Sequence, residues 1–324
     1  MTVIVIVSIN FIFACTGEPG KNHKPHSRGL PYELAMIIPQ SAWKGELKDT
    51  LEAVLQASTP VLNQHEPLFR LDVVYAEGNL TPWRTLRNRL IVDLDKSAVR
   101  PTMGIALDPV ARPQIEVRVT AASVHELSVF IGANRHRLTD LFVDHELDTE
   151  AANLRRRHST ITSDSLYKLS GHTICVPPAL KASKVGTCFL WTGTNLNDAD
   201  QNFVFYSYDW DGCPLTLQQY VEKRDSAMQA NILGARQGQW MQTAKEKDKP
   251  LVYARARTIN NKQVLQVHGL WELRSGALGG AFVSMERIDT LSRLVLVTEG
   301  FIYSPHSPKR NLLRQMEAAL RTFE

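Results

Sequence analysis

Two pairs of neighbouring residues carry the beginning of a zinc-protease motif. Residues 125–126 and 145–146 both read His-Glu, the first two positions of H-E-x-x-H. That motif needs a second His one helical turn later, so that both imidazoles reach the same metal ion. Val129 and Thr149 stand at those positions. Neither motif is complete, and we expect both pairs to be solvated residues on helix faces.

A second metal-binding pattern is also incomplete. Asp198, Asp200 and Asn202 have the spacing of the first ligands in a calcium-binding loop. The sixth position of such a loop is a glycine that allows a sharp turn, and here it is Phe203. We therefore expect an acidic surface turn at this point, and we expect neither a metal site nor a cofactor in the chain.

The sequence also lacks the local motifs of common hydrolases and nucleotide-binding enzymes. It has no G-x-S-x-G nucleophile elbow. Gly276, Gly279 and Gly280 are not followed by the Lys-Ser/Thr pair of a phosphate-binding loop, and we expect a hairpin turn there. A triad assembled from distant residues stays open, so a hydrolase is the alternative to a protein without enzymatic activity.

The composition is that of a globular protein. The 324 residues are 44% hydrophobic and 22% charged, which excludes global disorder. The formal net charge of +4 is too small for the basic surface of a nucleic-acid-binding protein. A chain of this length holds one large domain or two domains of about 150 residues.

The first residues have the pattern of an export signal. Residues 3–14, VIVIVSINFIFA, form an apolar run that is shorter than the ~20 residues of a membrane-spanning helix. Ala14 precedes Cys15 as in a bacterial lipobox, and residues 16–29 are polar and typical of a tether. We expect a signal peptide over 1–14, then a lipidated Cys15 and a flexible linker over 15–29. The alternatives are an uncleaved or ordinary secreted start, or a buried first strand.

Lipidation of Cys15 would leave an odd number of cysteines, namely Cys175, Cys188 and Cys213. Cys175 and Cys188 lie on candidate neighbouring strands, and they could form a disulfide in an oxidising compartment. The alternative is that all three are small buried hydrophobic residues.

Hydrophobic periodicity predicts a first half over residues 30–158. Ser41 stands where a helix N-cap belongs, directly before an amphipathic stretch. A second apolar stripe predicts one long helix from about 123 to 157. The predicted strands of this half are 33–38, 68–76, 88–95 and 115–120.

The polar stretch 158–166 predicts a boundary, and a second half follows over 167–324. Its predicted strands lie near 172–177, 187–192 and 202–209, and the aromatics of the third, FVFYSYDW (203–210), are expected on both faces of a covered sheet. A helix over 215–231 precedes an antiparallel meander, in which Asn260-Asn261 forms the first turn. A helix over 308–322 ends the chain. The sequence therefore predicts an α+β fold of two halves with largely antiparallel sheets, each closed by a C-terminal helix.

Three segments together resemble a known family. They read RDSAMQANILGARQGQWMQT (224–243), HGLWELRSGALGGAFVS (268–284) and EGFIYSPHSPKRNLLRQMEAAL (299–320). With ELAMIIPQSAWKGELKDTL near the front, the chain resembles domain-of-unknown-function family 4837 over roughly residues 30–322. The members of that family are lipoproteins of Bacteroidota, which implies an anchor at Cys15. The resemblance implies no activity, because none is assigned to the family.

The resemblance also selects candidate binding residues. Arg224, Asp225, Trp271 and Glu272 are polar or aromatic and lie inside the recognised segments. We expect a binding or assembly module of the cell envelope, anchored by acyl chains in the outer membrane and facing the periplasm. Its expected partner is an envelope protein, glycan or lipid, and not a nucleic acid. The alternative is an envelope hydrolase that acts on cell-wall or lipid substrates.

Overall fold

The computed structural model describes residues 24–324. Cys15, the apolar run before it and the first part of the expected linker lie outside the described residues. The last part of that linker is held against the protein body. Ser27 donates its backbone N–H to the Arg112 carbonyl oxygen (3.1 Å), and the Arg28 N–H donates to the Thr85 carbonyl oxygen (2.8 Å). The described residues 25–28 therefore run along the first half of the protein.

The first half contains a five-stranded sheet in the order β2-β1-β3-β5-β4. Three of its four pairings are parallel, and only β4 with β5 is antiparallel. Four strands match the prediction, whereas β4 was missed because most of its side chains are exposed and it contains Gly104. The strands are β1 (Glu33–Ile38), β2 (Arg70–Tyr75), β3 (Asn88–Leu94), β4 (Thr102–Leu107) and β5 (Ile115–Ala121).

The helices of the first half differ from the prediction at two points. Ser41 is not an N-cap, because it lies in the short 3-10 helix η1 (Gln40–Ala42), and α1 (Gly45–Leu55) begins after Lys44. The expected single helix is divided at Asn134 into α2 (Val124–Ala133) and α3 (Arg135–Arg156). The Asn134 side chain donates to the Phe130 carbonyl oxygen (2.9 Å), and such local bonds compete with helical ones. A second 3-10 helix, η2 (Thr81–Trp83), follows β2.

The second half contains a larger sheet in the order β12-β13-β14-β15-β8-β7-β6. All neighbours in this order are antiparallel, and β9 also pairs with β13. The main strands are β6 (Ala182–Val185), β7 (Phe189–Gly193), β8 (Asp200–Asp209), β9 (Met241–Thr243), β12 (Val252–Ile259), β13 (Lys262–Leu273), β14 (Gly279–Asp289) and β15 (Leu294–Tyr303). A small hairpin is formed by β10 (Lys245–Glu246) and β11 (Lys249–Pro250).

The predicted meander is confirmed. Asn260 and Asn261 both have positive φ (49° and 60°), as the tight turn between β12 and β13 requires. Helices α5 (Leu217–Asn231) and α6 (Arg310–Leu320) lie close to the predicted ranges. The α+β prediction is confirmed for the chain, whose pairings are largely antiparallel although the first sheet is mostly parallel.

One predicted strand within residues 158–177 needs correction. Most of the polar stretch 158–166 belongs to a helix, α4 (Thr160–Ser170), which Ser159 caps by accepting a bond from the Thr162 N–H. Residues 172–177 form no strand of the sheet. They run beside the C-terminal residues instead, where the N–H of Thr173 donates to the Glu324 carbonyl oxygen (3.0 Å).

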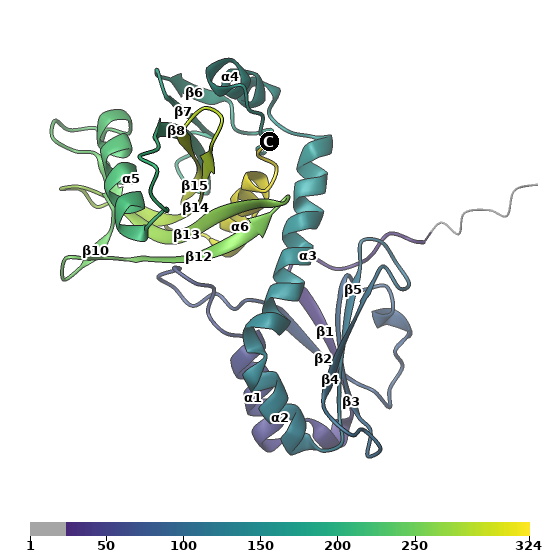
Figure 1. Ribbon diagram of the computed structural model, residues 1–324. Coiled ribbons are helices and arrows are strands. Elements are labelled where there is room, and N and C mark those ends of the chain that lie inside the picture. Colours follow the sequence, from purple (N-terminus) through teal and green to yellow (C-terminus); the bar gives the residue numbers. More distant parts are fainter. Residues whose placement is uncertain (1–23) are drawn as a thin grey trace, which may run out of the picture.

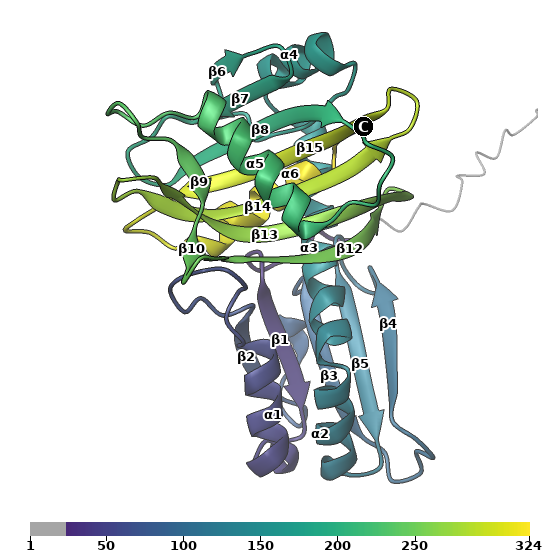
Figure 2. The same cartoon turned by 60° about the vertical axis from the view of Figure 1, so that its left-hand side comes forward.

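Helices cover both faces of the second sheet (Figure 2). Helix α5 crosses one face and packs on an aromatic cluster that includes Tyr206, Tyr220 and Phe282. Helix α6 covers the other face and contacts α3 of the first half. Long α3 runs from one half to the other in Figure 1. The described helices are all too short or too polar to cross a membrane.

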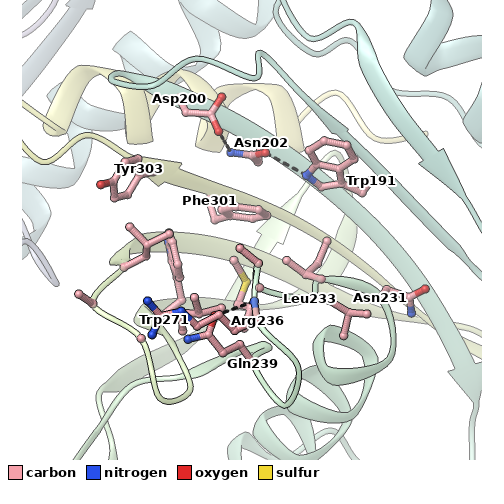
Figure 3. Close-up of a pocket in the computed structure, with 18 of the residues that line it drawn as sticks. Trp191, Asp200, Asn202, Asn231, Leu233, Arg236, Gln239, Trp271, Phe301 and Tyr303 are labelled. Carbon is pink, nitrogen blue, oxygen red and sulfur yellow. Dashed lines mark hydrogen bonds between the residues drawn. The ribbon is translucent and has the colours of Figure 1, made fainter.

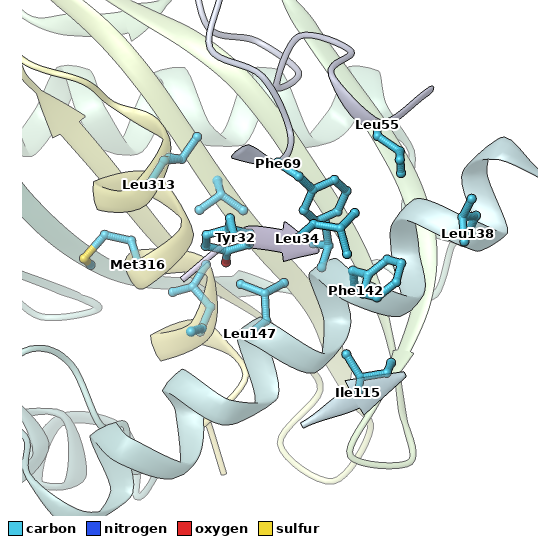
Figure 4. Close-up of a cluster of buried hydrophobic side chains, with 14 of the residues drawn as sticks. Tyr32, Leu34, Leu55, Phe69, Ile115, Leu138, Phe142, Leu147, Leu313 and Met316 are labelled. Carbon is cyan, nitrogen blue, oxygen red and sulfur yellow. The ribbon is translucent and has the colours of Figure 1, made fainter. Parts of the chain in front are cut away.

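The two halves share one hydrophobic core (Figure 4). Tyr32 and Leu34 of the first half lie in the same cluster as Leu313 and Met316 of α6. Phe142 of α3 packs edge-on against Phe69, with ring centroids 5.8 Å apart. Because one cluster joins residues of both sheets, we expect the halves to unfold together.

The substitution Leu313→Ala tests this shared core. Leu313 is buried, and its truncation should lower the free energy of unfolding by about 2–5 kcal/mol. Because the chain has six Trp residues, unfolding is followed by fluorescence in two backgrounds, one that retains only Trp43 and one that retains only Trp271. The same loss should register in both backgrounds. Leu291→Ala is the control, since Leu291 is 96% exposed. A shift of the Trp271 signal without the Trp43 signal would contradict a common core.

Candidate functional site

A cavity of about 830 Å³ opens on the α5 face of the second sheet (Figure 3). One wall is formed by residues of β7 and β8, and the opposite wall by the loops 232–239 and 274–278. The floor consists of side chains from β9, β13 and β15. The side chains that line the cavity include Trp191, Asp200 and Asn202 on the strand wall, Met241, Trp271, Phe301 and Tyr303 on the floor, and Leu233, Arg236, Gln239 and Leu278 on the loop wall.

A chain of hydrogen bonds fixes the indole on the strand wall. The Trp191 ring N–H donates to Oδ1 of Asn202 (2.9 Å), and Nδ2 of Asn202 donates to Oδ2 of Asp200 (2.8 Å). Asp200 also accepts from the Thr194 hydroxyl and from the Leu196 backbone N–H (3.1 Å). The Asp200 carboxylate therefore has three donors within the protein, and its structural effect is to orient Asn202 and Trp191.

The indole on the floor is fixed in a similar way. The Trp271 ring N–H donates to the Ile302 carbonyl oxygen (3.1 Å), and its ring packs edge-on against Phe301 with centroids 5.7 Å apart. Gly280 lies directly beside it. A Cβ at residue 280 would come within 2.1 Å of the Ile302 carbonyl oxygen and 2.9 Å of the Trp271 ring nitrogen. Only glycine allows this close approach of backbone and ring.

The loop wall carries the exposed part of the site. The Gln239 side chain joins its two loops, since its Nε2 donates to the Ser275 carbonyl oxygen (2.8 Å) and its Oε1 accepts from the Arg236 backbone N–H (3.2 Å). Leu233 and Leu278 are 66% and 45% exposed. Two leucines at the rim of an aromatic cavity expose apolar surface to water, which is unfavourable and is typical of a binding surface.

A fully buried ion pair supports the floor. The Arg224 guanidinium of α5 donates from Nε to Oε2 of Glu299 (2.8 Å) and from Nη2 to Oε1 (2.7 Å). It also lies over the Phe282 ring, 3.9 Å from the centroid, and contacts the Met241 sulfur (3.8 Å). Burial opposes the charge of Arg224, but the Glu299 carboxylate outweighs it and raises the pKa of the guanidinium. Arg224 therefore stays charged beneath the cavity.

The four candidate residues from the sequence divide into two groups. Trp271 lines the cavity, and Arg224 lies directly beneath the floor. Asp225 accepts bonds from the Thr243 backbone N–H and hydroxyl (2.7 Å each). Thr243 in turn receives a bond from Arg224 (3.1 Å), so these residues form one network. Glu272 follows Trp271 on the strand and therefore points to the opposite face, where Gln242 donates to it (2.8 Å).

Sequence reasoning missed the strand wall of the cavity. Asp200 and Asn202 were considered only as an acidic turn, and Trp191 was not singled out. The spacing of Asp200 and Asn202 on a strand indicates a common face, but nothing local indicates that this face meets Trp271. Asp198 points elsewhere and accepts from the Ser307 hydroxyl (3.1 Å). No group of three or more His, Cys, Asp or Glu side chains within residues 24–324 could hold a metal ion.

The two His-Glu pairs have different surroundings. His125 is exposed beside Glu46, with Nδ1 and Oε2 3.2 Å apart. Glu146 is not solvated as expected but is buried, because Arg87 pairs with it (2.8 Å) and Asn88 and the Tyr32 backbone N–H donate to it. Its carboxylate thus belongs to the contact between α3 and the first sheet.

The described cysteines form no disulfide. Cys175, Cys188 and Cys213 are free, and Cys188 and Cys213 are exposed, so the expectation that all three are buried is wrong. Segment 172–177 runs beside the C-terminus and is not a strand next to β7, which is why Cys175 and Cys188 are not neighbours across a ladder. The aromatics of β8 do lie on both sheet faces, with Phe205 packed under α6 and Tyr206 under α5.

The substitution Glu299→Gln tests the ion pair. It leaves the Arg224 charge buried without its counter-charge, which should lower the free energy of unfolding by about 3–5 kcal/mol. The double variant Arg224→Met/Glu299→Gln removes both charges, and it should lose less than the sum of the losses of the single variants Arg224→Met and Glu299→Gln. Arg118→Met is the control, because both side chains of the Arg118–Asp93 pair are exposed and the pair should contribute about 0–1 kcal/mol. Additive losses in urea unfolding would show that the pair is not coupled.

No curated protein matches this chain. Among solved structures it is similar to the Saccharomyces cerevisiae Ran-binding protein Mog1p, at 13% identity and a TM-score of 0.32, over 48% of this chain and 92% of that chain. A point mutant of protein Mog1 is similar at 12% identity and a TM-score of 0.30, over 47% of this chain and 89% of that chain. These TM-scores are too low to support an argument about this protein.

Two family models match the chain. Residues 27–155 match a model described as Domain of unknown function (DUF8532). The resemblance expected over residues 30–322 is therefore found only for the second half, where residues 159–322 match Domain of unknown function (DUF4837). This second match contains the cavity and the ion pair beneath it, and it spans half of the sequence. The chain belongs to the family described as Domain of unknown function (DUF4837).

Proposed function

We propose that this protein is a lipid-anchored binding module of the cell envelope, and that the cavity above the Arg224–Glu299 pair is its binding site. The observation that carries the proposal is the pair of indoles, Trp191 and Trp271, each held by a hydrogen bond in a cavity of about 830 Å³. This volume lies within the range of small-molecule sites, which are mostly apolar with a few placed polar groups.

The fixed aromatic walls favour binding. Trp191 is oriented by Asn202, and Trp271 by the Ile302 carbonyl oxygen. A ligand would therefore meet side chains that need not rearrange, and this lowers the entropy cost of association. The exposed leucines of the loop wall add apolar area at the mouth, where a bound ligand would exclude water.

The chemistry of the lining residues favours binding over hydrolysis. A hydrolytic site needs a nucleophile with an adjacent base, or a pair of carboxyl groups. The described lining residues include one carboxylate, Asp200, and neither His nor Cys. Ser275 belongs to the loop wall with no base beside it among these residues. The envelope hydrolase is for this reason the weaker of the two functions.

The anchor rests on the sequence. The apolar run 3–14 ends before Cys15, and the family resemblance of the sequence implies a lipoprotein. Each acyl CH₂ buried in a membrane contributes ~0.8 kcal/mol, so that two or three chains hold a protein stably where one would not. The binding half would then be retained at the membrane that carries its ligand.

The cavity is tested by placing charge at its mouth. Leu233→Asp and Leu278→Asp should each weaken binding of the apolar probe 1-anilinonaphthalene-8-sulfonate at least about tenfold, because the new carboxylate opposes apolar contact and repels the sulfonate. Leu107→Asp is the matched control, since it adds the same charge at a leucine of β4 in the first half that is 67% exposed, like Leu233. Probe fluorescence measures the affinity. Equal affinities in all three variants would rule out this cavity as the binding site.

The anchor is tested in the native host with an alkyne-bearing fatty acid. The wild-type protein should incorporate the label and sediment with membranes, and Cys15→Ser should do neither, because no thiol is available for acylation. Cys213→Ser is the control, as it removes an exposed thiol of the protein body. Labelling that persists in Cys15→Ser would refute lipidation at this residue.

A further inference from the structure

The cavity combines aromatic walls with neutral polar side chains. Asn202, Gln239 and Tyr303 lie around the indoles, and each can donate as well as accept hydrogen bonds. Asn202 and Gln239 each use one N–H and one oxygen lone pair on protein partners, and each keeps a second N–H and a second lone pair for a ligand. A fully apolar ligand such as an acyl chain would remove these remaining groups and the Tyr303 hydroxyl from water without giving them partners, which is unfavourable. The lining therefore matches a ligand with apolar faces and a polar rim.

A sugar ring has this shape, whereas an extended peptide does not suit the site. The C–H groups of a sugar ring form flat apolar faces that pack on aromatic rings, and its hydroxyls lie around the edge. Extended peptides are commonly bound by adding a strand to a free sheet edge. Strands β7 and β13, which carry the two indoles, are each paired on both sides at Trp191 and Trp271, so that a peptide could not add as a strand beside either indole.

The charges at the cavity are not balanced. Asp200 is satisfied by Thr194, Leu196 and Asn202. The Lys184 ammonium donates to the Asn231 carbonyl oxygen (2.8 Å), and it has no carboxylate partner among the described residues. The Arg236 guanidinium likewise has no carboxylate partner in the described part of the chain. Figure 3 places Arg236 on the wall opposite Asp200. Two cations without counter-ions at the mouth would attract an anionic group.

We propose that the ligand of this cavity is an acidic saccharide, a sugar ring that carries a carboxylate or phosphate group. This inference rests on the proposed binding function. The ring packs against Trp191 and Trp271, the amide side chains bond to its hydroxyls, and Arg236 and Lys184 pair with its anionic group. An Arg side chain can bind a carboxylate or a phosphate with two parallel hydrogen bonds, which adds geometric specificity.

The test is isothermal titration calorimetry on the purified full chain. The ligands are trigalacturonate, mannose 6-phosphate, and the uncharged counterparts galactotriose and mannose. We expect at least one acidic sugar to bind at least about tenfold more tightly than its uncharged counterpart, and to weaken as salt rises. The carboxylate and phosphate ligands distinguish the two sources of the anionic group.

Substitution of the two cations tests whether they cause the preference for an acidic sugar. Lys184→Gln/Arg236→Gln should abolish the preference, so that the acidic sugar and its uncharged counterpart bind with equal affinity. The hairpin variant Lys247→Gln/Lys249→Gln removes the same charge from exposed residues elsewhere, and it should retain the preference. A preference that survives the cavity variant would overturn the role of these two cations.

The outcomes separate this inference from the proposed function. Equal affinity for acidic and uncharged sugars would overturn the acidic class. If no sugar binds but the apolar probe still does, the saccharide inference fails and the binding function stands. If neither sugar nor probe binds, both fail. Tighter binding of the acidic tripeptide Glu-Trp-Glu than of any sugar would identify a peptide site and overturn the inference.

Discussion

Helix α6 connects the parts of this protein, and its three charged contacts explain why it lies where it does. At its beginning, the Glu66 carboxylate of the first half accepts the backbone N–H groups of Lys309 and Arg310 (2.8 Å each), where the helix dipole favours a negative charge. In its middle, Glu317 accepts a hydrogen bond from the Gln266 side chain of β13 (2.8 Å) and pairs with Arg314 of the same helix (2.7 Å). At its end, Arg321 pairs with carboxylates of α3. The helix is thereby tied to both halves, and its apolar side chains join their cores.

The opposite face of the second sheet is organised by another buried charge pair. Arg224 and Glu299 would be unfavourable apart, because each charge would lose its hydration without a partner. Their pairing places α5 over β15, and it brings β9 close enough for Thr243 and Met241 to contact Arg224. The floor of the cavity consequently rests on a rigid network. The binding residues above it, Trp191 and Trp271, are fixed by bonds of their own and share no hydrogen bond with the ion pair.

Local sequence patterns predicted most of the helices and strands, but they did not predict the tertiary contacts around them. The antiparallel meander and its Asn260-Asn261 turn were predicted correctly, because side-chain alternation and left-handed dihedrals are local properties. Strand β4 was missed because its exposed side chains show no alternation. Glu146 was expected in solvent, since its burial depends on Arg87, which directly precedes β3 and is far from Glu146 in the sequence. Trp271 was selected as a candidate from its segment, whereas its partner across the cavity, Trp191, was not.

The sequence by itself determined the α+β class, the positions of the main helices and strands, and the apolar run that ends before Cys15. These properties follow from periodicity and residue type within short windows. Only the tertiary structure decided that both halves share one core and that β7, β8, β13 and β15 enclose a cavity. Such contacts join residues far apart, as with Glu66 and Lys309, which are 243 positions apart. Which distant residues meet depends on the packing of all elements together, and no local pattern encodes it.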